Sequence, residues 1–452
     1  MGMATTSKPP LFHSKLLCIS LLYLSAALFL ALRTLLSTAD GLFRRPLYAP
    51  IQTSFSYNSS YGEHKHALPT LRPSCVSPVF FSGYWDVVRE IERLCRDSSS
   101  ALGAGNLRYV QGDGEGSFGG NFTAEKRFSY FDHSDDLKEI PCGFLKPFPV
   151  SNSDKTAMEG CNGVVVVSAM FNDHDKIRQP KGLGSSTLNT VCFFMFVDDV
   201  TINGLHNYNL ISTKSKEIIT VGVWRIVRVD KERLYENAAM NGVIPKYLTH
   251  RLFPNAKYSI WADAKMRLVV DPLLLVHSLV VKEGVDMAIS KHPLYLHTME
   301  EAMATARWKK WGAVDGLRMQ METYCENGMQ PWTSKKPYPS DVPDSAVIIR
   351  KHSKATNLFS CLLFNELEAF NPRDQLPFAY VRDSMNPKLR LNMFEVEVFE
   401  HVAVEYRHNL KHGGASGMHQ VGPRAKMESS AGLSIIGSKC DGYLVQMWGK
   451  SK

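Results

Sequence analysis

An apolar run that ends in an acidic turn constrains the fold of this chain most. Residues 258–261 (YSIW) begin after the breaker pair Pro254-Asn255 and end at the triplet Asp263-Ala264-Lys265. This is the pattern of a buried strand that brings Asp263 to the edge of a sheet, where α/β folds place their chemistry. A second apolar run ends in Asp271-Pro272, and proline suits the first turn of the apolar helix expected over residues 273–281. The alternative is that Asp263 and Asp271 are solvated turn residues.

The same layout, an apolar run followed by polar side chains, recurs before this stretch. Residues 164–170 (VVVVSAM) lead directly into the loop 171–176 (FNDHDK), residues 191–197 end in Asp198-Asp199, and residues 221–229 precede Asp230. Residues 238–253, which separate these runs from the Asp263 strand, have mostly helical periodicity. Strands that alternate with helices predict a mostly parallel sheet that is covered on both faces.

Further elements of the same domain are predicted beyond the acidic triplet. They are a strand over 285–290, a helix over 299–311, a proline-rich loop over 331–343, a short strand over 347–349 and a run with alternating Val and Phe over 393–404. We therefore expect one α/β domain over residues 159–412, with a mixed, mostly parallel sheet. A small, polar tail follows over residues 413–452.

The N-terminal part of the chain predicts a membrane anchor. Residues 16–32 carry no charge and lie between Lys15 and Arg33, which is the short end of the length of a spanning helix. We favour an uncleaved anchor over a cleaved signal peptide because the apolar run exceeds the usual signal-peptide core. The acceptor sequons at Asn58 and Asn121 follow this segment, as a lumenal body requires. Residues 1–15 are then a cytosolic tail, 33–73 a stem and 74–158 an N-terminal subdomain.

Composition and charge narrow the class of protein further. The 452 residues are 44% hydrophobic and 21% charged, which suits a folded body and excludes disorder of the whole chain. The net charge of +8 is scattered without a basic arm. We therefore expect no nucleic-acid partner.

Cysteine usage is compatible with disulfides in a lumenal body. Eight of the nine cysteines follow the anchor, and none has the C-x-x-C spacing of a zinc ribbon. Cys192 lies inside an apolar run and is expected to be a buried free thiol. The bridged set is expected to be Cys75, Cys95, Cys142 and Cys161.

An acidic turn after a strand, with Asp374-Gln375 and His408 elsewhere in the chain, suggests a nucleotide-sugar-binding glycosyltransferase architecture. In such folds the turn holds a divalent cation such as Mn²⁺ on the diphosphate, because the departing nucleoside diphosphate develops negative charge. Asp263 and His408 are the candidate metal ligands. The triplet departs from the usual acid-x-acid pattern, since Lys265 stands where the second carboxylate would be. Lys265 could replace the charge of the metal, or mark a site that no longer transfers sugars.

Four strings carry a resemblance to a known family: FNDHDKIRQP at 171–180, IWADAK at 260–265, ATARW at 304–308 and NPRDQL at 371–376. From Ser74 to its C-terminal region, the chain resembles the plant glycosyltransferase-like family, once catalogued as a domain of unknown function, that contains mucilage-related hexosyltransferases and the turgor regulation defect protein. Segments 151–154 and 393–399 make the similarity to the latter member strongest. The resemblance implies a nucleotide-diphospho-sugar transferase-like (GT-A-like) fold. It also implies a single-pass, type II protein of the Golgi membrane, or of the endoplasmic reticulum, with a lumenal body.

The resemblance implies two different activities. One is hexosyl transfer from a nucleotide sugar to a glycan acceptor. The other is hydrolysis of ceramide to sphingosine and fatty acid, because the turgor regulation member is described as an alkaline ceramidase. An amide hydrolase commonly activates water on zinc, and the chain has no H-E-x-x-H spacing. Sequence pattern therefore favours sugar transfer, and a catalytically inactive scaffold is a third possibility because of Lys265.

The candidate site residues fall at the ends of predicted strands or at junctions between elements. We assign catalytic roles to Asp263, Lys265 and Asp374. Plain alternatives exist: Asp374 could cap the helix that begins near Gln375, and Lys265 could point to solvent or pair with Asp271. The candidate substrate-binding residues are Asn172, Asp173, His174, Asp175, Lys176, Arg178, Asp198, Asp199, Arg373, Gln375 and His408.

Overall fold

The computed structural model describes residues 19–32, 81–96, 107–112, 116–134, 137–211, 218–230, 234–307, 314–406 and 440. Residues 19–32 form a helix with exposed side chains, and the start of the expected anchor at residues 16–18 lies outside the described residues. None of the described helices combines the length and the apolar character needed to cross a bilayer. The other described elements belong to the unit that begins after residue 50.

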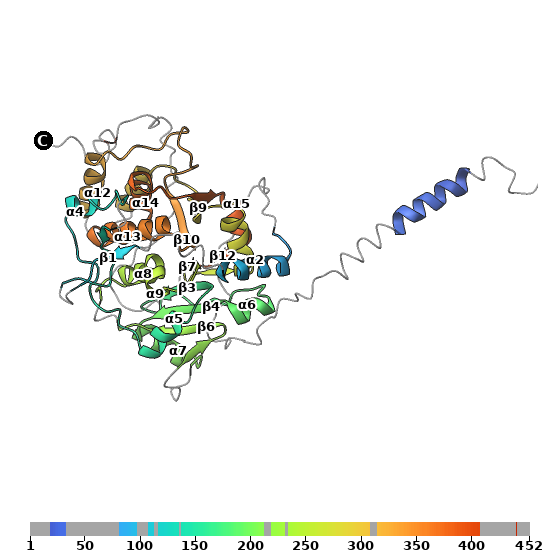
Figure 1. Cartoon of the computed structure of the whole chain (residues 1–452), viewed down its shortest axis with the longest axis horizontal. Coiled ribbons are helices and arrows are strands. Elements are labelled where there is room, and N and C mark those ends of the chain that lie inside the picture. The colour runs from blue at the N-terminus through green and yellow to red at the C-terminus, as the bar shows by residue number, and fades with distance from the viewer. Residues whose placement is uncertain are drawn as a thin grey trace, which may run out of the picture. The chain divides into compact units, whose positions relative to one another are not determined.

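An eight-stranded mixed sheet forms the centre of this unit (Figure 1). Strands β3, β4, β6 and β7 run parallel to one another, β9 pairs parallel with β11, and β10 is inserted antiparallel between β7 and β9. The sheet thus has the mixed character that the sequence predicts. Its strands, in spatial order, are β11 (Leu391–Phe394), β9 (Met287–Lys291), β10 (Pro343–Lys351), β7 (Tyr258–Ala262), β3 (Val164–Met170), β4 (Cys192–Val197), β6 (Trp224–Arg228) and β5 (Ile219–Val221).

Two smaller sheets and a set of helices complete the unit. The small sheets pair β1 (Arg108–Tyr109) with β2 (Glu139–Ile140), and β8 (Met266–Leu268) with β12 (Ala403–Glu405). The helices are α2 (Tyr84–Arg96), α4 (Ala124–Phe128), α5 (Asn152–Glu159), α6 (Ser185–Thr190), α7 (Asp199–Asn207), α8 (Ala238–Tyr247), α9 (Thr249–Leu252), α10 (Pro272–Val276) with its π-helical continuation η4 (His277–Val281), α11 (Thr298–Arg307), α12 (Val314–Glu326), α13 (Lys354–Ala369), α14 (Gln375–Ser384) and α15 (Val396–Val402).

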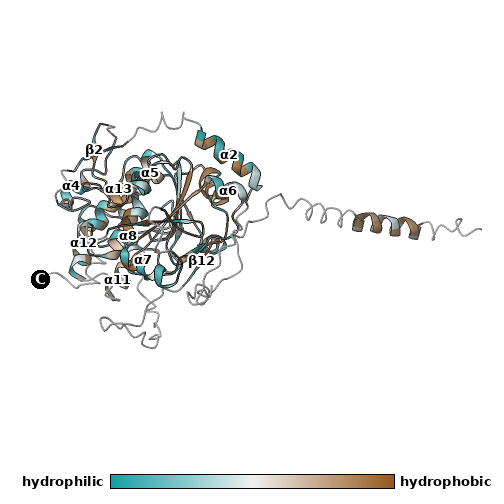
Figure 2. Cartoon of the chain, turned by 90° about the horizontal axis from the view of Figure 1, so that it is seen from below, coloured by the Kyte–Doolittle hydropathy of each residue, from teal (hydrophilic) through white to brown (hydrophobic). Residues whose placement is uncertain are grey.

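The core lies between the central strands and the helices that cover them. Residues 164–167 of β3 are all buried, as expected for a strand that is covered on both faces. Helices α8 and α13 pack against each other beside β3, whereas α10 contacts β3, β7 and β10 and is in turn covered by α2. Figure 2 shows the apolar residues concentrated in the central strands, with hydrophilic residues along outward helix faces. Burial of this apolar surface is the main driving force for folding of the unit. It thereby holds in place the edge of the sheet where the polar loops emerge.

Two of the runs identified in the sequence do not form a single continuous strand. The run 221–229 begins at the last residue of β5, reverses direction at Gly222, whose φ is 62°, and continues as β6, so the expected strand covers residues 224–228. The run 393–404 consists of the end of β11, helix α15 and the start of β12. Its buried residues Val398, Phe399 and Val402 have helical spacing, so the Val and Phe alternation did not indicate a strand there.

The disulfides differ from the expected set. Cys142 bonds to Cys361, Cys161 to Cys192 and Cys325 to Cys440, and Cys95 is a free thiol. The prediction of a free thiol at Cys192 was wrong, and Cys75 lies outside the described residues. The Cys142–Cys361 bond joins positions 219 residues apart. A cross-link that closes so long a loop restricts the unfolded chain strongly, and so stabilises the fold.

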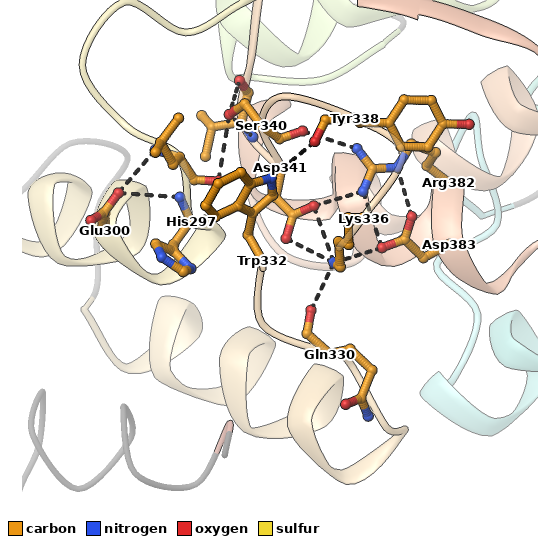
Figure 3. A network of polar contacts seen from close by, with 12 residues as sticks. His297, Glu300, Gln330, Trp332, Lys336, Tyr338, Ser340, Asp341, Arg382 and Asp383 are labelled. Atoms are coloured by element: carbon orange, nitrogen blue, oxygen red, sulfur yellow. Dashed lines mark hydrogen bonds and ion pairs between the residues drawn. The ribbon is translucent and has the colours of Figure 1, made fainter. Parts of the chain in front are cut away.

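A buried network of ion pairs fixes the proline-rich loop that precedes β10 (Figure 3). The Arg382 guanidinium, whose side chain is 1% exposed, lies 2.6 Å from the Asp341 carboxylate and donates a hydrogen bond to the Ser340 carbonyl. The Lys336 ammonium lies 2.9 Å from both Asp341 and Asp383. The expected loop over 331–343 is therefore tied to helix α14, which sets where β10 begins.

Candidate active site

A cavity of about 530 Å³ opens at the edge of the sheet where β3 and β7 end. The parallel strands deliver the loops after Met170 and Ala262 to this edge. Strand β10 runs antiparallel to β7, so its first residues reach the same edge, and the Asp263 N–H donates to the Ala346 carbonyl at 2.8 Å. The sequence-predicted residues that line the cavity are Asn172, His174, Asp175, Asp263, Lys265, Arg373, Asp374 and Gln375.

Lys246 is the central cation of the cavity, and the sequence analysis did not single it out. Its Nζ lies 2.7 Å from Asp374 Oδ2, 3.5 Å from Asp263 Oδ1 and 3.1 Å from Ser345 Oγ. Burial alone would lower the pKa of Lys246, but the carboxylates of Asp263 and Asp374 outweigh it and raise the pKa. Lys246 is therefore a buried ammonium that holds two predicted site carboxylates together.

Asp374 does not act as the cap that was considered as its alternative role. It precedes α14, but its side chain makes no capping hydrogen bond. Oδ2 instead accepts from the Tyr247 hydroxyl at 2.8 Å and pairs with Lys246. Burial would raise the pKa of Asp374, but the Lys246 ammonium and these hydrogen bonds lower it. Asp374 is consequently an anion at neutral pH.

The Asp263 carboxylate is oriented by its own strand. The indole Nε1 of Trp261 donates a hydrogen bond to Asp263 Oδ1 at 2.7 Å. Oδ2 of Asp263 receives no hydrogen bond from any described residue. Because Trp261 is buried and fixed, Oδ1 is held in place while Oδ2 remains available to a ligand.

Lys265 forms an ion pair within the site, so it neither points freely to solvent nor pairs with Asp271. Its Nζ lies 2.7 Å from Glu405 Oε1 on β12, the strand that pairs with β8. Burial would lower the pKa of Lys265, but Asp263 and then Glu405 outweigh it and raise the pKa. Asp271 does not pair with Lys265. It caps α10 through the Leu273 N–H and accepts from the Gly184 N–H and the Thr187 hydroxyl.

Asp344 is a further carboxylate that lines the cavity, and it was not among the residues predicted from the sequence. Burial raises its pKa to about 6, although the Ala346 N–H donates to Oδ1 at 3.1 Å and Lys265 lies nearby. Lys246 is shared between Asp374 and Asp263, and Lys265 pairs with Glu405, so the carboxylates of Asp263, Asp344, Asp374 and Glu405 share two ammonium groups. Arg373 adds no free positive charge because it pairs with Glu301 at 2.6 Å.

This surplus of negative charge suits a divalent cation. Mg²⁺ and similar hard cations are often held by one or two carboxylates together with the phosphate oxygens of a substrate. Within the described part of the chain, no three His, Cys, Asp or Glu donors converge at this edge. Asp263 and Asp344 therefore fit a cation whose shell a phosphate ligand completes. His408, the other candidate metal ligand, lies outside the described residues.

The loop after β3 is anchored to the start of helix α7. Asn172 and Asp173 both have positive φ, at 59° and 51°. The Asn172 N–H donates to Asp198 Oδ2 and the Asp173 N–H donates to Thr201 Oγ1, each at 3.0 Å. Asp198 is buried and caps α7 through the Thr201 N–H. These contacts turn the loop so that His174 and Asp175 reach the cavity wall.

Several predicted substrate-binding residues do not line the cavity. Asp173 and Asp198 are buried in the loop anchor, and Asp199 pairs with Arg228 on the surface. The Lys176 ammonium lies 4.1 Å from the Tyr208 ring centroid, and the Arg178 guanidinium 4.0 Å from that of Tyr406. Of the two acceptor asparagines, Asn121 is exposed and Asn58 lies outside the described residues.

Gln375 offers the cavity an unused acceptor. Its side chain is buried, and Oε1 has no hydrogen-bond partner among the residues that the structure describes. A buried carbonyl oxygen without a partner costs about 1–3 kcal/mol. A bound ligand with a hydroxyl or N–H group at this point would remove that cost.

The missed residues had only weak signals in the sequence. Lys246 is a charged residue within the otherwise apolar end of α8, next to Tyr247. A lysine in a buried helical run indicates a buried partner, but the sequence does not say which carboxylate it meets. Asp344 follows Pro343 at the start of β10, where an acidic residue is unremarkable.

A protein-family model for the TOD1/MUCI70 glycosyltransferase-like domain matches residues 106–408. The chain is 59% identical over 463 aligned residues to "Alkaline ceramidase TOD1" of Arabidopsis thaliana, covering 99% of both chains. It is 36% identical over 300 residues to "Probable hexosyltransferase MUCI70" of the same plant, covering 63% of this chain and 50% of that protein.

Two solved structures overlap with part of the fold. An apo structure of the bifunctional glycosyltransferase WbbM matches 51% of this chain and 38% of its own at 11% identity. The apo structure of mouse xyloside xylosyltransferase 1 matches 51% of this chain and 84% of its own at 7% identity. Both TM-scores are 0.29, a value at which the overlap does not define a common fold. The family match and the relatives in Arabidopsis thaliana instead show that the chain belongs to the TOD1/MUCI70 glycosyltransferase-like family.

Proposed function

We propose that this chain transfers a hexosyl group from a nucleotide sugar to a glycan acceptor in the cavity at the ends of β3 and β7. The observation that carries the proposal is that carboxylates outnumber ammonium groups at this cavity, where Asp263 and Asp344 lie beside the buried Lys246–Asp374 pair. A cavity of about 530 Å³ lies within the usual range of small-ligand sites. The family description and the name of the hexosyltransferase relative support the same class of reaction.

The residues present assign roles within this reaction. Asp263 and Asp344 would hold a divalent cation such as Mn²⁺, which when bound offsets the negative charge of the leaving diphosphate. Lys265, kept charged beside Asp263, adds fixed positive charge at the same edge. Asp374 stays anionic and accepts from a sugar hydroxyl or positions it, and Gln375 Oε1 accepts from a neighbouring hydroxyl.

A test of this function compares two reactions in the same preparation. The purified full chain is incubated with a panel of nucleotide sugars, or with labelled ceramide, with and without a chelator. Release of nucleoside diphosphate that stops in Asp263→Asn and in chelator supports sugar transfer. A Lys282→Glu variant, with an exposed substitution away from the cavity, is the matched control and should keep full activity.

Ceramide hydrolysis is the second candidate function, and the name of the relative with 59% identity favours it. Release of a free sphingoid base, without nucleoside diphosphate, would establish it and overturn the transfer proposal. Inactivity in both assays, with the control variant folded, would support an inactive scaffold.

We also propose a type II Golgi membrane protein with a lumenal body, anchored through residues 16–32. The uncharged run and the two sequons support this placement. Glycosidase treatment of microsomes should then shift the mobility of the chain, and protease added outside intact vesicles should spare the body. An unglycosylated body that protease degrades would contradict it.

A further inference from the structure

A second cavity, of about 680 Å³, lies on another part of the α/β unit. It shares no lining residue with the cavity at the ends of β3 and β7. Helices α5 and α9 pack together at its side, and the loop before α5 supplies much of its wall. Its apolar lining consists of Phe144, Pro147, Phe148, Pro149, Val150, Met158, Leu252 and Pro254.

Arg251 is the most constrained cation of this cavity. Its guanidinium lies 3.9 Å from the ring centroid of Tyr109 and 4.8 Å from that of Phe144. Its one hydrogen bond to a described residue runs from Nη1 to the Cys142 carbonyl at 3.3 Å. No carboxylate in the described part of the chain pairs with it. The two rings fix the orientation of the guanidinium. A guanidinium carries five N–H donors, and only one of those of Arg251 is bonded to a described residue.

Two lysines, Lys146 and Lys155, line the same cavity. Neither Lys146 nor Lys155 forms an ion pair with a described residue, whereas Lys246 and Lys265 in the other cavity are both paired. Glu159 is the one acidic residue in the lining. The cavity therefore has an excess of positive charge beside an apolar wall.

This combination indicates the chemistry of a ligand. A fixed guanidinium with two lysines recognises a carboxylate or phosphate group, since the planar fork of arginine matches both anions. The prolines, phenylalanines, Met158 and Leu252 offer apolar contact to the rest of the molecule. A sugar chain would instead need several neutral hydrogen-bonding side chains for its hydroxyls, and Asn152 is the one such residue in the lining.

We propose that this cavity binds an anionic amphiphile, in which an acyl or alkyl chain carries a phosphate or carboxylate group. The charged group contacts Arg251, Lys146 and Lys155, and the chain lies against Phe148 and the prolines. The site is independent of the proposed sugar transfer, so either can fail without the other.

The test measures binding to the full chain in nanodiscs of neutral lipid. The probes are octyl phosphate and octanoate, with octanol, inorganic phosphate and a uronic acid oligosaccharide as comparisons. We expect octyl phosphate or octanoate to bind, and the difference between these two identifies the preferred anion. Octanol and inorganic phosphate should each bind about tenfold more weakly or worse, because each lacks one half of the recognition.

Variants separate the site from general effects on folding. Lys155→Glu, on the exposed face of α5, should weaken octyl phosphate binding about tenfold while leaving the far-ultraviolet circular dichroism unchanged. Arg251→Lys keeps the charge but loses the planar fork, and should also weaken binding. Lys282→Glu is the matched charge reversal outside the cavity and should have no effect. Equal binding of octanol, preferential binding of the oligosaccharide, no binding of any probe, or equal losses in Lys282→Glu would each overturn the proposal.

Discussion

Replacement of Lys246 by methionine tests the centre of the candidate active site. Methionine keeps the length and apolar stem of the side chain but removes the ammonium that lies 2.7 Å from Asp374. Asp374 is then a buried carboxylate whose hydrogen bond from Tyr247 remains but whose cation is gone. Loss of one partner of a buried ion pair costs roughly 3–5 kcal/mol. For a body larger than 250 residues this corresponds to a fall in the unfolding midpoint of about 6–10 °C.

The pH dependence of this loss follows from the pKa of Asp374. In the wild type this pKa is lowered, so the stabilisation is present above the unfolded value of about 3.9 and is lost only as the pH falls through the folded value. Without Lys246, burial raises the pKa of Asp374. The variant is then least stable at pH 7.5, and it recovers as the pH falls toward 4.5 because Asp374 takes up a proton.

Thermal unfolding of both proteins at pH 7.5 and 4.5 measures this effect. The double variant Lys246→Met/Asp374→Asn removes both charges and should regain most of the lost midpoint at pH 7.5, since replacement of a whole buried pair is often nearly neutral. A midpoint fall of the same size at both pH values, or no recovery in the double variant, would refute the electrostatic explanation.

The remaining predictions concern three other positions. Burial raises the pKa of Asp344 to about 6, so its ionised carboxylate destabilises the folded state at pH values above the pKa of the unfolded chain. Asp344→Asn should therefore raise the unfolding midpoint at pH 7.5 and have little effect at pH 4. In the same variant, titration calorimetry should show weaker Mn²⁺-dependent binding of nucleoside diphosphate. Lys265→Ala should weaken nucleoside diphosphate binding by about 1–3 kcal/mol with or without Mn²⁺. Lys265→Asp should lose binding in the absence of Mn²⁺ and regain it when Mn²⁺ is supplied. Unchanged calorimetric affinities in both variants would show that Lys265 is not part of the site. Arg382→Met removes one of the two cations that Asp341 contacts and leaves Lys336 as the other, so it should cost about 1.5–3 kcal/mol in denaturant unfolding. A loss below about 0.5 kcal/mol would show that the network in Figure 3 does not anchor the loop before β10.

Some of the site could be predicted from local pattern alone. The runs 164–170 and 258–261 are continuous apolar segments of strand length, and both form strands at or within one residue of those positions. Polar residues directly after such runs must emerge at the ends of the strands, because a strand buried on both faces leaves them nowhere else to go. Asn172, His174, Asp175, Asp263 and Lys265 therefore reached the cavity as expected from their neighbours in sequence.

What the sequence left open was the set of long-range partners. The Asp263 triplet reads as one carboxylate and one ammonium, but its electrostatics depend on Lys246, Asp344 and Glu405, which come from a helix and two other strands. Strand β10 places Asp344 at the cavity because it runs antiparallel beside β7, and a short apolar run does not state its direction. The disulfide partner of Cys142, 219 residues away, was equally hidden. Periodicity and burial are properties of a local stretch of chain, whereas pairing across a sheet is decided by which surfaces the whole chain buries against each other.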